Sequence, residues 1–453
     1  MKENNIKGFS IIGLFGTNDV KIIFEEDVKI LIGENGIGKT QVLNLFYYTL
    51  QQDFLKLWEF NFKEIIIDFD FEKINITRER VGRLIKDVYK NPLVKDFIEE
   101  FGYSYFEHLR NLFIKFKGNR IKFEKEIGLN YKTYKKLPLS RALRVFEHIE
   151  FESNNLFNSE LLNIGDKIRN AIKGYDILYF PTYRRVEEEL HIIGYDEEKI
   201  SFDDDKTLIQ FGMDDVQRRF DFVQEKIDKL AKEGFAQFTK DILNVVLEDV
   251  ASNDDIFDKI NEDDIEIILS RVGNLLSQTQ KDSVKSTVVN KVYKNPLSGY
   301  LLQKLVDIYE KQKSLDTAIK EFRDVCNRYL LNKEVYYDES AIRIYVKSNI
   351  TGKEIKLNKL SSGEKQIVSI FSKVYLPETL NRFIVLFDEP ELSLSMLWQR
   401  QLLPDIINSK KCALLIAVTH SPFIFDNELD KYAVGLSEYI SDTTEIIEYD
   451  EPN

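Results

Sequence analysis

The segment Gly33–Thr40 constrains this chain more than any other stretch of the sequence. It reads Gly-Glu-Asn-Gly-Ile-Gly-Lys-Thr and matches the pattern G-x-x-x-x-G-K-[ST] at every fixed position. An apolar run at 28–32 precedes it and residues with helical spacing follow it, so the pattern lies between a strand and a helix. Backbone N–H groups of such a loop bind phosphate at a helix N-terminus, which favours anions. The segment therefore predicts binding of a nucleoside triphosphate.

Each position of this loop is a candidate ATP-binding residue. The eight candidates are Gly33, Glu34, Asn35, Gly36, Ile37, Gly38, Lys39 and Thr40. Lys39 is expected to reach the β- and γ-phosphates, and the Thr40 hydroxyl is expected to hold Mg²⁺. The expected cofactors are therefore ATP and Mg²⁺.

Two further apolar runs end in polar residues. The run at 383–387 ends in Asp388 and Glu389, and a buried strand with this ending suits Mg²⁺ binding by Asp388 and water activation by Glu389. The run at 413–418 is followed by Thr419 and His420. A lone histidine is usually a satisfied surface or core residue, but beside the carboxylate strand His420 can contact the γ-phosphate.

A helix start with small polar residues lies before the carboxylate strand. Residues 360–366 read Leu-Ser-Ser-Gly-Glu-Lys-Gln and open a segment of helical apolar spacing. Ser361, Ser362, Gly363 and Glu364 could bind an anion through hydroxyl and backbone donors. On its own this pattern is a weak signal. It becomes informative because it precedes the apolar run that ends in Asp388 and Glu389.

Composition limits the class of protein. The chain has 453 residues, enough for two or three domains or for one domain with a large insertion. The sequence has no run of 18 apolar residues and no signal-peptide pattern, so we expect a cytoplasmic protein without a membrane anchor. Cys326 and Cys412 lie in apolar segments and are expected to be buried free thiols. The four histidines show no metal-ligand spacing, so no structural zinc is expected.

The net charge of −13 argues against a surface that is basic all over, so any contact with nucleic acid needs a local patch. One candidate is the stretch 115–144, which has ten Lys or Arg residues against two Glu, interleaved with Phe and Tyr. It is either a nucleic-acid patch or a solvated basic hairpin and helix on an insertion.

The remaining pattern alternates between strands and helices. Strands are expected at 9–12, 20–24, 63–69, 74–78, 176–180, 335–337, 342–346 and 355–357, with a mostly helical region at 81–170. The strand at 176–180 delivers Arg184 and Arg185 either to a ligand crevice or to a surface at the sheet edge. Helical patterns at 214–230 and 305–326 predict either a short antiparallel arm or an ordinary helical subdomain.

Together these motifs resemble the ATP-binding cassette ATPases, in particular the heads of the Rad50, SMC, RecF and OLD kind. They appear in the family's order: Walker A (33–40), signature (360–366), Walker B (383–389), D-loop region (393–395) and the switch histidine, His420. The resemblance implies an α/β fold, an ABC ATPase head with a P-loop core in a mixed sheet and an antiparallel β lobe. The head is expected at 1–80, 176–190 and 333–453, with a helical insertion at 81–175 and a helical, short coiled-coil-like arm at 191–332.

The resemblance also implies a composite site, in which two heads enclose two ATP molecules. Lys39 and Thr40 of one subunit would face Ser362 and Gly363 of the other. Glu389 would be the general base.

In the same site His420 would stabilise the γ-phosphate. The sequence departs from the family at two places. Tyr183 and Arg184 stand where a Q-loop glutamine is expected, and Ser395 stands where relatives often have His-Pro.

The motifs at 14–16, 180–185 and 212–216 are similar to the ATPase subunits of bacterial anti-phage systems, most to the AriA family of PARIS and next to the PtuA family of Septu. About thirty residues follow His420, without an acidic metal cluster, so no nuclease domain of the OLD kind is expected. The resemblance implies homodimers within a larger ring, often a hexamer. The ring would hold a nuclease or toxin effector until a phage protein or phage DNA is sensed. The alternative is a RecF-like or Rad50-like DNA-repair ATPase that binds DNA through 115–144.

Overall fold

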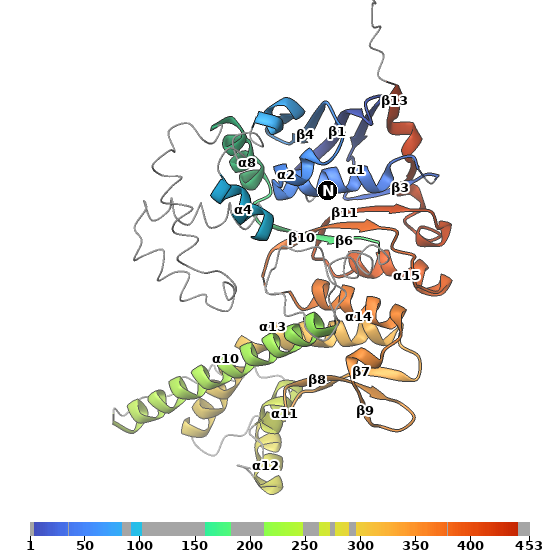
Figure 1. The fold of residues 1–453 in the computed structure, drawn as a ribbon. Coiled ribbons are helices and arrows are strands. Elements are labelled where there is room, and N and C mark those ends of the chain that lie inside the picture. Colours follow the sequence, from blue (N-terminus) through green and yellow to red (C-terminus); the bar gives the residue numbers. More distant parts are fainter. Residues whose placement is uncertain are drawn as a thin grey trace, which may run out of the picture. The chain divides into compact units, whose positions relative to one another are not determined.

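The computed structural model describes residues 4–34, 36–83, 92–101, 159–182, 213–247, 262–271, 277–289, 296–377 and 379–442. The chain divides into two compact units, 1–210 with 381–453 and 211–380 (Figure 1). Each unit is built around its own sheets and helices.

The first unit contains two five-stranded sheets. The antiparallel sheet has the order β13 (Ile440–Asp442), β2 (Asn18–Ile23), β1 (Ile6–Leu14), β4 (Glu64–Phe69) and β5 (Lys73–Thr77). The parallel sheet has the order β12 (Ala433–Gly435), β3 (Val28–Ile32), β11 (Cys412–Thr419), β10 (Arg382–Asp388) and β6 (Tyr175–Phe180).

Burial along the strands follows from these two arrangements. In β5, buried Ile74 and Ile76 alternate with more exposed neighbours, as in a strand with one solvated face. In β10 every residue from Phe383 to Asp388 is buried, because helices and strands cover both faces of a central parallel strand.

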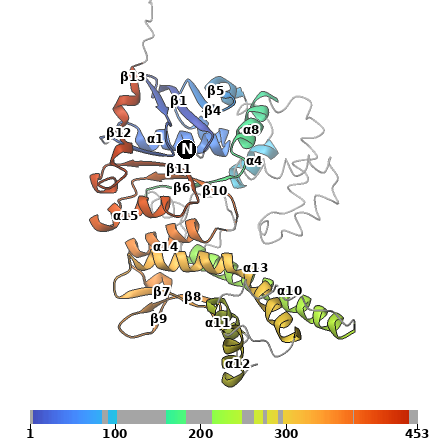
Figure 2. The same ribbon diagram turned by 180° about the vertical axis from the view of Figure 1, so that it is seen from behind.

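Helix α1 (Lys39–Gln51) lies between the two sheets, and α15 (Met396–Ile407) lies on the other side of the parallel sheet (Figures 1 and 2). The Phe46 ring of α1 meets Phe9 of β1 at 4.9 Å and Phe24, the residue after β2, at 5.7 Å. The same helix contacts β6, β10 and β11. Other described helices of this unit are α2 (Phe54–Trp58), α4 (Pro92–Phe101), α8 (Ser159–Ala171), η4 (Pro422–Ile424), η5 (Asp430–Tyr432) and η6 (Leu436–Tyr439).

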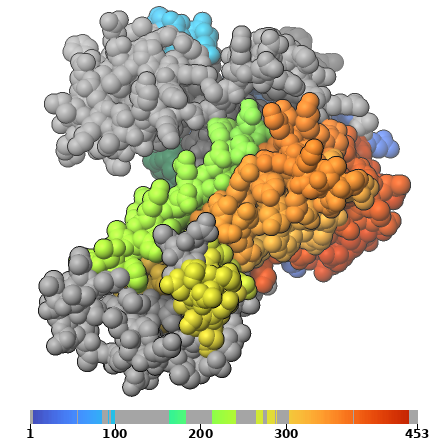
Figure 3. Space-filling model, turned by 90° about the horizontal axis from the view of Figure 1, so that it is seen from below, coloured from blue at the N-terminus to red at the C-terminus, as the bar shows by residue number. Residues whose placement is uncertain are grey.

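The second unit is built on two long helices, α10 (Met213–Leu247) and α13 (Pro296–Asn327), which lie side by side (Figures 1 and 2). Figure 3 shows α10, in green, from below. They run antiparallel, because Phe220 of α10 meets Phe322 at 5.5 Å while Gly234 approaches Ile308. The other elements are α11 (Glu262–Arg271), α12 (Gln278–Val289), β7 (Lys333–Asp338), β8 (Arg343–Ser348), β9 (Glu354–Ile355), η3 (Leu357–Lys359) and α14 (Ser362–Tyr375).

A half-buried arginine joins three elements of this second unit. Arg271 at the end of α11 donates to Gln312 and Asp316 of α13, both at 2.6 Å, and to the Tyr337 hydroxyl of β7 at 3.2 Å. Burial by itself would lower the pKa of Arg271, but the bond to Asp316 outweighs it, so the guanidinium stays charged.

The structure confirms the expected fold class and most of the expected strands. The P-loop sheet is wholly parallel, and the antiparallel strands form a sheet of their own. The strand at 176–180 is β6, at the edge of the parallel sheet, while Arg184 and Arg185 lie outside the described residues. The basic stretch 115–144 also lies outside them.

Some expectations from the sequence needed correction. The two long helices have 35 and 32 residues, longer than the apolar patterns at 214–230 and 305–326. The third strand of β7–β9 ends at Ile355, and Leu357 opens a 3-10 helix. Cys326 is buried, which raises the pKa of its thiol, but Cys412 is only half-buried at the start of β11. Among the described helices, none has the length and apolar character that crossing a bilayer requires.

The first prediction concerns the close approach of α10 and α13. A Cβ at Gly234 would lie 2.7 Å from Cγ2 of Ile308, so Gly234→Ala should lower the free energy of unfolding by about 1–3 kcal/mol, measured by denaturant unfolding. In an Ile308→Ala background the same change should be neutral or stabilising, because alanine favours the helix by about 1 kcal/mol over glycine. Equal destabilisation in both backgrounds would contradict this packing.

Candidate active site

Three parallel strand ends form the frame of the site. In the parallel sheet Thr419 of β11 lies opposite Ile32 of β3, and Val418 lies opposite Asp388 of β10. Parallel strands present their carboxyl ends at the same edge of a sheet. The loop after β3, the carboxylates after β10 and His420 after β11 therefore meet at one edge.

The P-loop takes a backbone shape that its glycines permit. Gly36 and Gly38 have φ angles of 88° and 95°, in the left-handed region that glycine enters without a steric penalty. Gly38 is the N-cap of α1, and no side chain caps this helix end. The first N–H groups of α1 can therefore bind an anion. Asn35 lies outside the described residues.

The Lys39 ammonium is held inside this loop. The residue Lys39 is 6% exposed, and its ammonium donates to the carbonyl oxygens of Gly33 at 2.6 Å and Glu34 at 2.9 Å. Burial lowers its pKa below the ordinary value, although the carboxylates of Glu389, Asp388 and Glu391 act in the opposite direction. Two carbonyl oxygens of the loop itself thus hold this ammonium.

Thr40 and Asp388, the two residues expected to hold Mg²⁺, are in direct contact. The Thr40 hydroxyl donates to Oδ1 of Asp388 at 2.9 Å, across 348 positions of the chain. Asp388 is 2% exposed at the end of β10. A hydroxyl and a carboxylate are hard oxygen ligands of the kind that Mg²⁺ prefers, so this pair fits the ion.

Glu389 stands in a strained position beside the switch histidine. Its φ angle is 51°, although its backbone N–H still donates to the Val418 carbonyl at 2.9 Å. Non-glycine residues in this region cluster at functional sites. Nε2 of His420 lies 3.8 Å from Oε1 of Glu389, and both side chains are about one-third exposed. The two groups can therefore face a common ligand.

Glu391 is a site residue that we did not predict from the sequence. Its Oε2 accepts from the Thr419 hydroxyl at 2.7 Å, and its Oε1 accepts from the backbone N–H groups of His420 at 2.9 Å and Ser421 at 3.2 Å. One carboxylate thus fixes the whole turn that carries the switch histidine. The only sequence signal is its place two residues after Glu389.

Gln399 on α15 joins the same turn to the D-loop region. Its Nε2 donates to the carbonyl of Leu394 at 2.9 Å and to that of Glu391 at 3.3 Å. Its Oε1 accepts from the Ser421 hydroxyl at 2.6 Å. Ser395, where relatives often have His-Pro, is the N-cap of α15.

The signature residues form a capped helix start in the unit 211–380. Ser361 caps α14, and its backbone N–H and hydroxyl donate to Oε2 of Glu364 at 2.8 and 3.0 Å. Lys333 reaches both oxygens of Glu364 at 2.7 Å. Burial would raise the pKa of Glu364, but the bonds from Lys333 and Ser361 outweigh it and lower that pKa. Glu364 thus stabilises the helix start, whereas Ser362 is exposed.

The structure brings together Walker A, Walker B and the switch histidine in one unit. The pairing of Ser362 and Gly363 with a second subunit remains a prediction. Tyr183, at the expected Q-loop position, lies outside the described residues. Just before it, Phe180 of β6 stacks on Phe387 of β10 at 4.4 Å, which fixes the strand that leads there.

Comparison with known proteins agrees with this set of motifs. The sequence model of the AAA ATPase domain family (AAA_15) matches residues 6–425. The chain is 22% identical over 424 residues to the "Retron Vc95 probable ATPase" of Vibrio cholerae serotype O1 biovar El Tor, covering 88% of this chain and 67% of that protein.

Solved structures were also found by comparison. An SMC head bound to the C-winged helix domain of ScpA is 10% identical, with a TM-score of 0.35, covering 93% of this chain and 90% of that one. The recombination mediator RecF with ATPγS is 10% identical, with a TM-score of 0.30, covering 93% of this chain and 95% of that one.

The second prediction tests Glu391 as a positioning residue for His420. Glu391→Leu removes three hydrogen bonds from the switch turn, and we expect kcat for ATP hydrolysis to fall about a hundredfold, since misplaced catalytic groups cost that much. KM should change less than about threefold, because the contacts of Lys39 remain. Steady-state kinetics measures both constants.

The matched control is Glu391→Gln, which keeps an acceptor for the two N–H groups and should retain most of the activity. A Glu391→Leu protein with unchanged kcat would show that the turn holds its shape without this carboxylate. A raised KM with normal kcat would assign Glu391 to nucleotide binding instead.

Proposed function

Since this chain belongs to the AAA ATPase domain family, we propose that it is the ATPase subunit of a two-component anti-phage system. It is an ATPase of the ABC type. In the proposed system it holds a nuclease or toxin effector and releases it when a phage protein or phage DNA is sensed. The short motifs favour an AriA-type subunit of a PARIS system, with a PtuA-type subunit of Septu as the alternative.

The proposed chemistry follows from the geometry of the site. Lys39 and the first N–H groups of α1 bind the triphosphate, and Thr40 with Asp388 holds Mg²⁺, which neutralises phosphate charge when bound. Glu389 accepts a proton from the attacking water. His420, fixed by Glu391, faces the γ-phosphate. Ser362 and Gly363 of a second copy would complete the site in a homodimer.

The observation that carries the proposal is the packing of the signature helix. Within the unit 211–380, α14 contacts both α10 and α13. Nζ of Lys373 on α14 lies 3.3 Å from Oδ2 of Asp215 on α10, and both side chains are largely buried. A shift of the signature residues upon nucleotide binding would therefore reach the helix pair. A sensor needs such a link between its ATP site and a surface that a partner can hold.

The named relative supports the same reading. Its name assigns a probable ATPase to a retron. We accordingly expect an effector protein encoded near this gene, and assembly into a larger ring.

The third prediction concerns a variant that binds ATP but does not hydrolyse it. Glu389→Gln keeps the binding groups and removes the base, so the protein should retain ATP and accumulate in its closed assembly. Expressed with its genomic neighbour, it should form a large particle with a second polypeptide in native mass spectrometry with ATP. Lys39→Ala is the control and should not retain ATP. A bare Glu389→Gln dimer, without the neighbour's product, would contradict the proposal.

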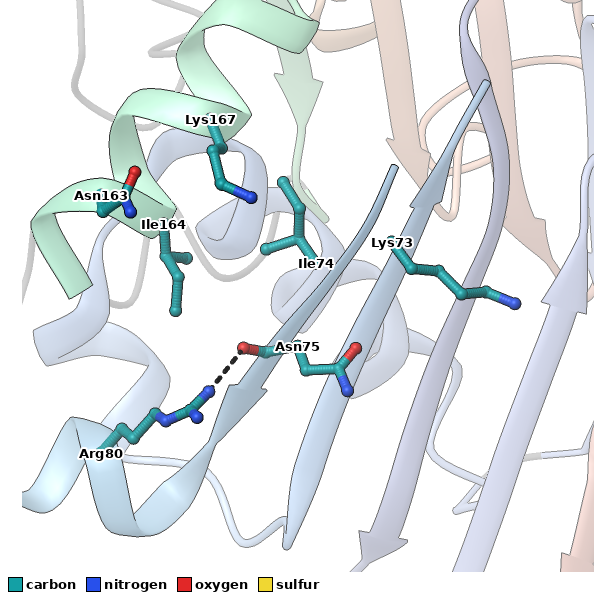
Figure 4. A pocket seen from close by; sticks show the side chains of 7 residues that line it. All are labelled: Lys73, Ile74, Asn75, Arg80, Asn163, Ile164 and Lys167. Atoms are coloured by element: carbon teal, nitrogen blue, oxygen red, sulfur yellow. Dashed lines mark hydrogen bonds between the residues drawn. The ribbon is translucent and has the colours of Figure 1, made fainter. Parts of the chain in front are cut away.

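A DNA-responsive ATPase of the RecF or Rad50 kind is the second candidate, and a pocket whose lining includes three Lys and Arg side chains favours it. The pocket, of about 420 Å³, lies between β5 and α8 (Figure 4). Its lining includes Lys73, Arg80 and Lys167 with two asparagines. Lys73 pairs with Asp68 at 3.0 Å and Lys167 with Glu72 at 2.5 Å, so the cationic excess is small.

The fourth prediction separates this candidate from the first. If the pocket binds DNA, duplex DNA should stimulate ATP hydrolysis, and Arg80→Glu with Lys167→Glu should reduce that stimulation at least tenfold and leave the basal rate intact. Raising the salt from 50 to 200 mM should abolish it as well. An ATPase rate that DNA does not change would remove the second candidate.

A further inference from the structure

Two large apolar side chains are exposed at the same end of the sheet β7–β9. Leu331 is 76% exposed and Ile350 is 78% exposed. The backbone N–H of Asn349 donates to the carbonyl of Asn332 at 3.1 Å. Leu331 comes one residue before this bond and Ile350 one residue after it, so both belong to that end of the sheet. A single exposed apolar residue is common, whereas a neighbouring pair offers a surface that another molecule can cover.

Three lysines continue from this end along the edge of the sheet. They are Lys353 before β9, Lys356 after it and Lys359 at the end of η3, and all three are exposed. Strand β9 is an edge strand of its sheet (Figure 1). The carbonyl of Lys353 accepts from the Ser348 N–H at 2.9 Å, across the turn that carries Ile350. The apolar pair and the three lysines therefore form one surface, the β9 surface.

The positive charge of the β9 surface is not balanced locally. Glu354, between the first two lysines, is bonded to Arg343 through both oxygens, at 2.9 and 2.8 Å. Among the described residues, none forms an ion pair with the ammonium groups of the three lysines. The chain as a whole has a net charge of −13, so this surface has the opposite sign.

Lysines on an edge strand can have a simpler role, because a charge there prevents pairing with the edge of another sheet. That role does not explain Leu331 and Ile350, since exposed apolar residues promote the association that such lysines prevent. The combination of both is instead typical of a protein interface. There apolar contacts supply affinity, and charges select the partner.

The occupant of the β9 surface must carry both negative charge and apolar side chains. Carboxylates of Asp or Glu would pair with the lysines, and large apolar side chains would cover Leu331 and Ile350. A nucleic-acid strand binds through its phosphates, and aliphatic side chains give its bases no flat surface for stacking. We propose that the β9 surface is the docking site for an acidic, partly apolar segment of the effector protein. This inference rests on the two-component function proposed above.

A segment docked on this surface would act close to the signature residues. Lys359 is followed two residues later by Ser361, the N-cap of α14. Lys333, two residues after Leu331, bonds both oxygens of Glu364 at 2.7 Å. The β9 surface is thus connected to the signature cap on both sides. A movement of the cap upon nucleotide binding would alter the docking site.

The test uses a random library of peptides of about 12 residues displayed on yeast, so it does not depend on knowing the effector. Cells are selected for binding to the full chain and depleted with the triple variant Lys353→Glu, Lys356→Glu, Lys359→Glu. The retained peptides should be rich in Asp, Glu and large apolar residues. A synthetic copy of one, labelled with fluorescein, should bind the triple variant at least about tenfold more weakly in fluorescence polarisation. Leu331→Ser with Ile350→Ser should weaken binding by a similar factor.

The matched control is Lys21→Glu, Lys173→Glu, Lys410→Glu. These lysines are also exposed, the change in net charge is the same, and all three lie in the other unit of the chain. Peptide binding should stay within about twofold of that of the unmodified protein, because salt screens distant charges. Thermal unfolding should be the same for every variant, so that a loss of binding cannot come from a loss of folding.

Three outcomes would overturn the proposal. The first is a set of retained peptides without an excess of carboxylates, or equal peptide binding by the triple variant and the unmodified chain. The second is binding of DNA, but of no peptide, that the triple variant loses, since the surface would then be a nucleic-acid site. The third is a smaller ATP-bound assembly of the triple variant alone, since the surface would then be a contact between copies.

Co-expression with the genomic neighbour separates this proposal from the two-component function. In the Glu389→Gln background, the triple variant should lose the second polypeptide from the particle, and the control variant should keep it. A particle that forms with the triple variant as well would reject the docking site alone. A particle that never forms, even with the three lysines intact, would reject the two-component function itself.

Discussion

The parallel pairing of β11 with both β3 and β10 is the constraint on which the site depends. It sets Thr419 beside Ile32 and Val418 beside Asp388, so three loops that are far apart in the chain start from one edge. A register slip of one residue would turn every buried side chain of a strand to the other face. Both faces of β10 and β11 are buried almost throughout, so a slip in either strand would not turn a polar face towards the core. The register of these strands must therefore be fixed by how their apolar side chains pack on both faces.

The strained residues of the site lie where these strands end. Glu389 and Ser393 have φ angles of 51° and 63°, and each such position costs about 1–3 kcal/mol. The buried strands supply the free energy that offsets this cost, and Glu391 holds the next turn in place. The hydrolytic groups can therefore sit in conformations that an isolated loop would not adopt.

Much of this arrangement could be predicted from the sequence, because its signals are local. The loop at 33–40 and the apolar run before Asp388 each lie within ten residues, and the strand and helix around the loop were predicted with them. The role of Glu391 could not be predicted, since its partners lie 28 to 30 positions later. The length of α10 was underestimated, because its second half continues past a glycine that serves contact with α13.

Hydrogen bonds and ion pairs connect the nucleotide motifs to elements that are distant from them in the sequence. Gln399 joins the D-loop region to the switch turn, and Lys333 joins the signature cap to β7. Polar contacts of this kind have fixed directions, so a displaced partner breaks them instead of stretching them. Rearrangement at the nucleotide would therefore move such groups between discrete positions. That behaviour would suit the holding and release of a partner proposed above.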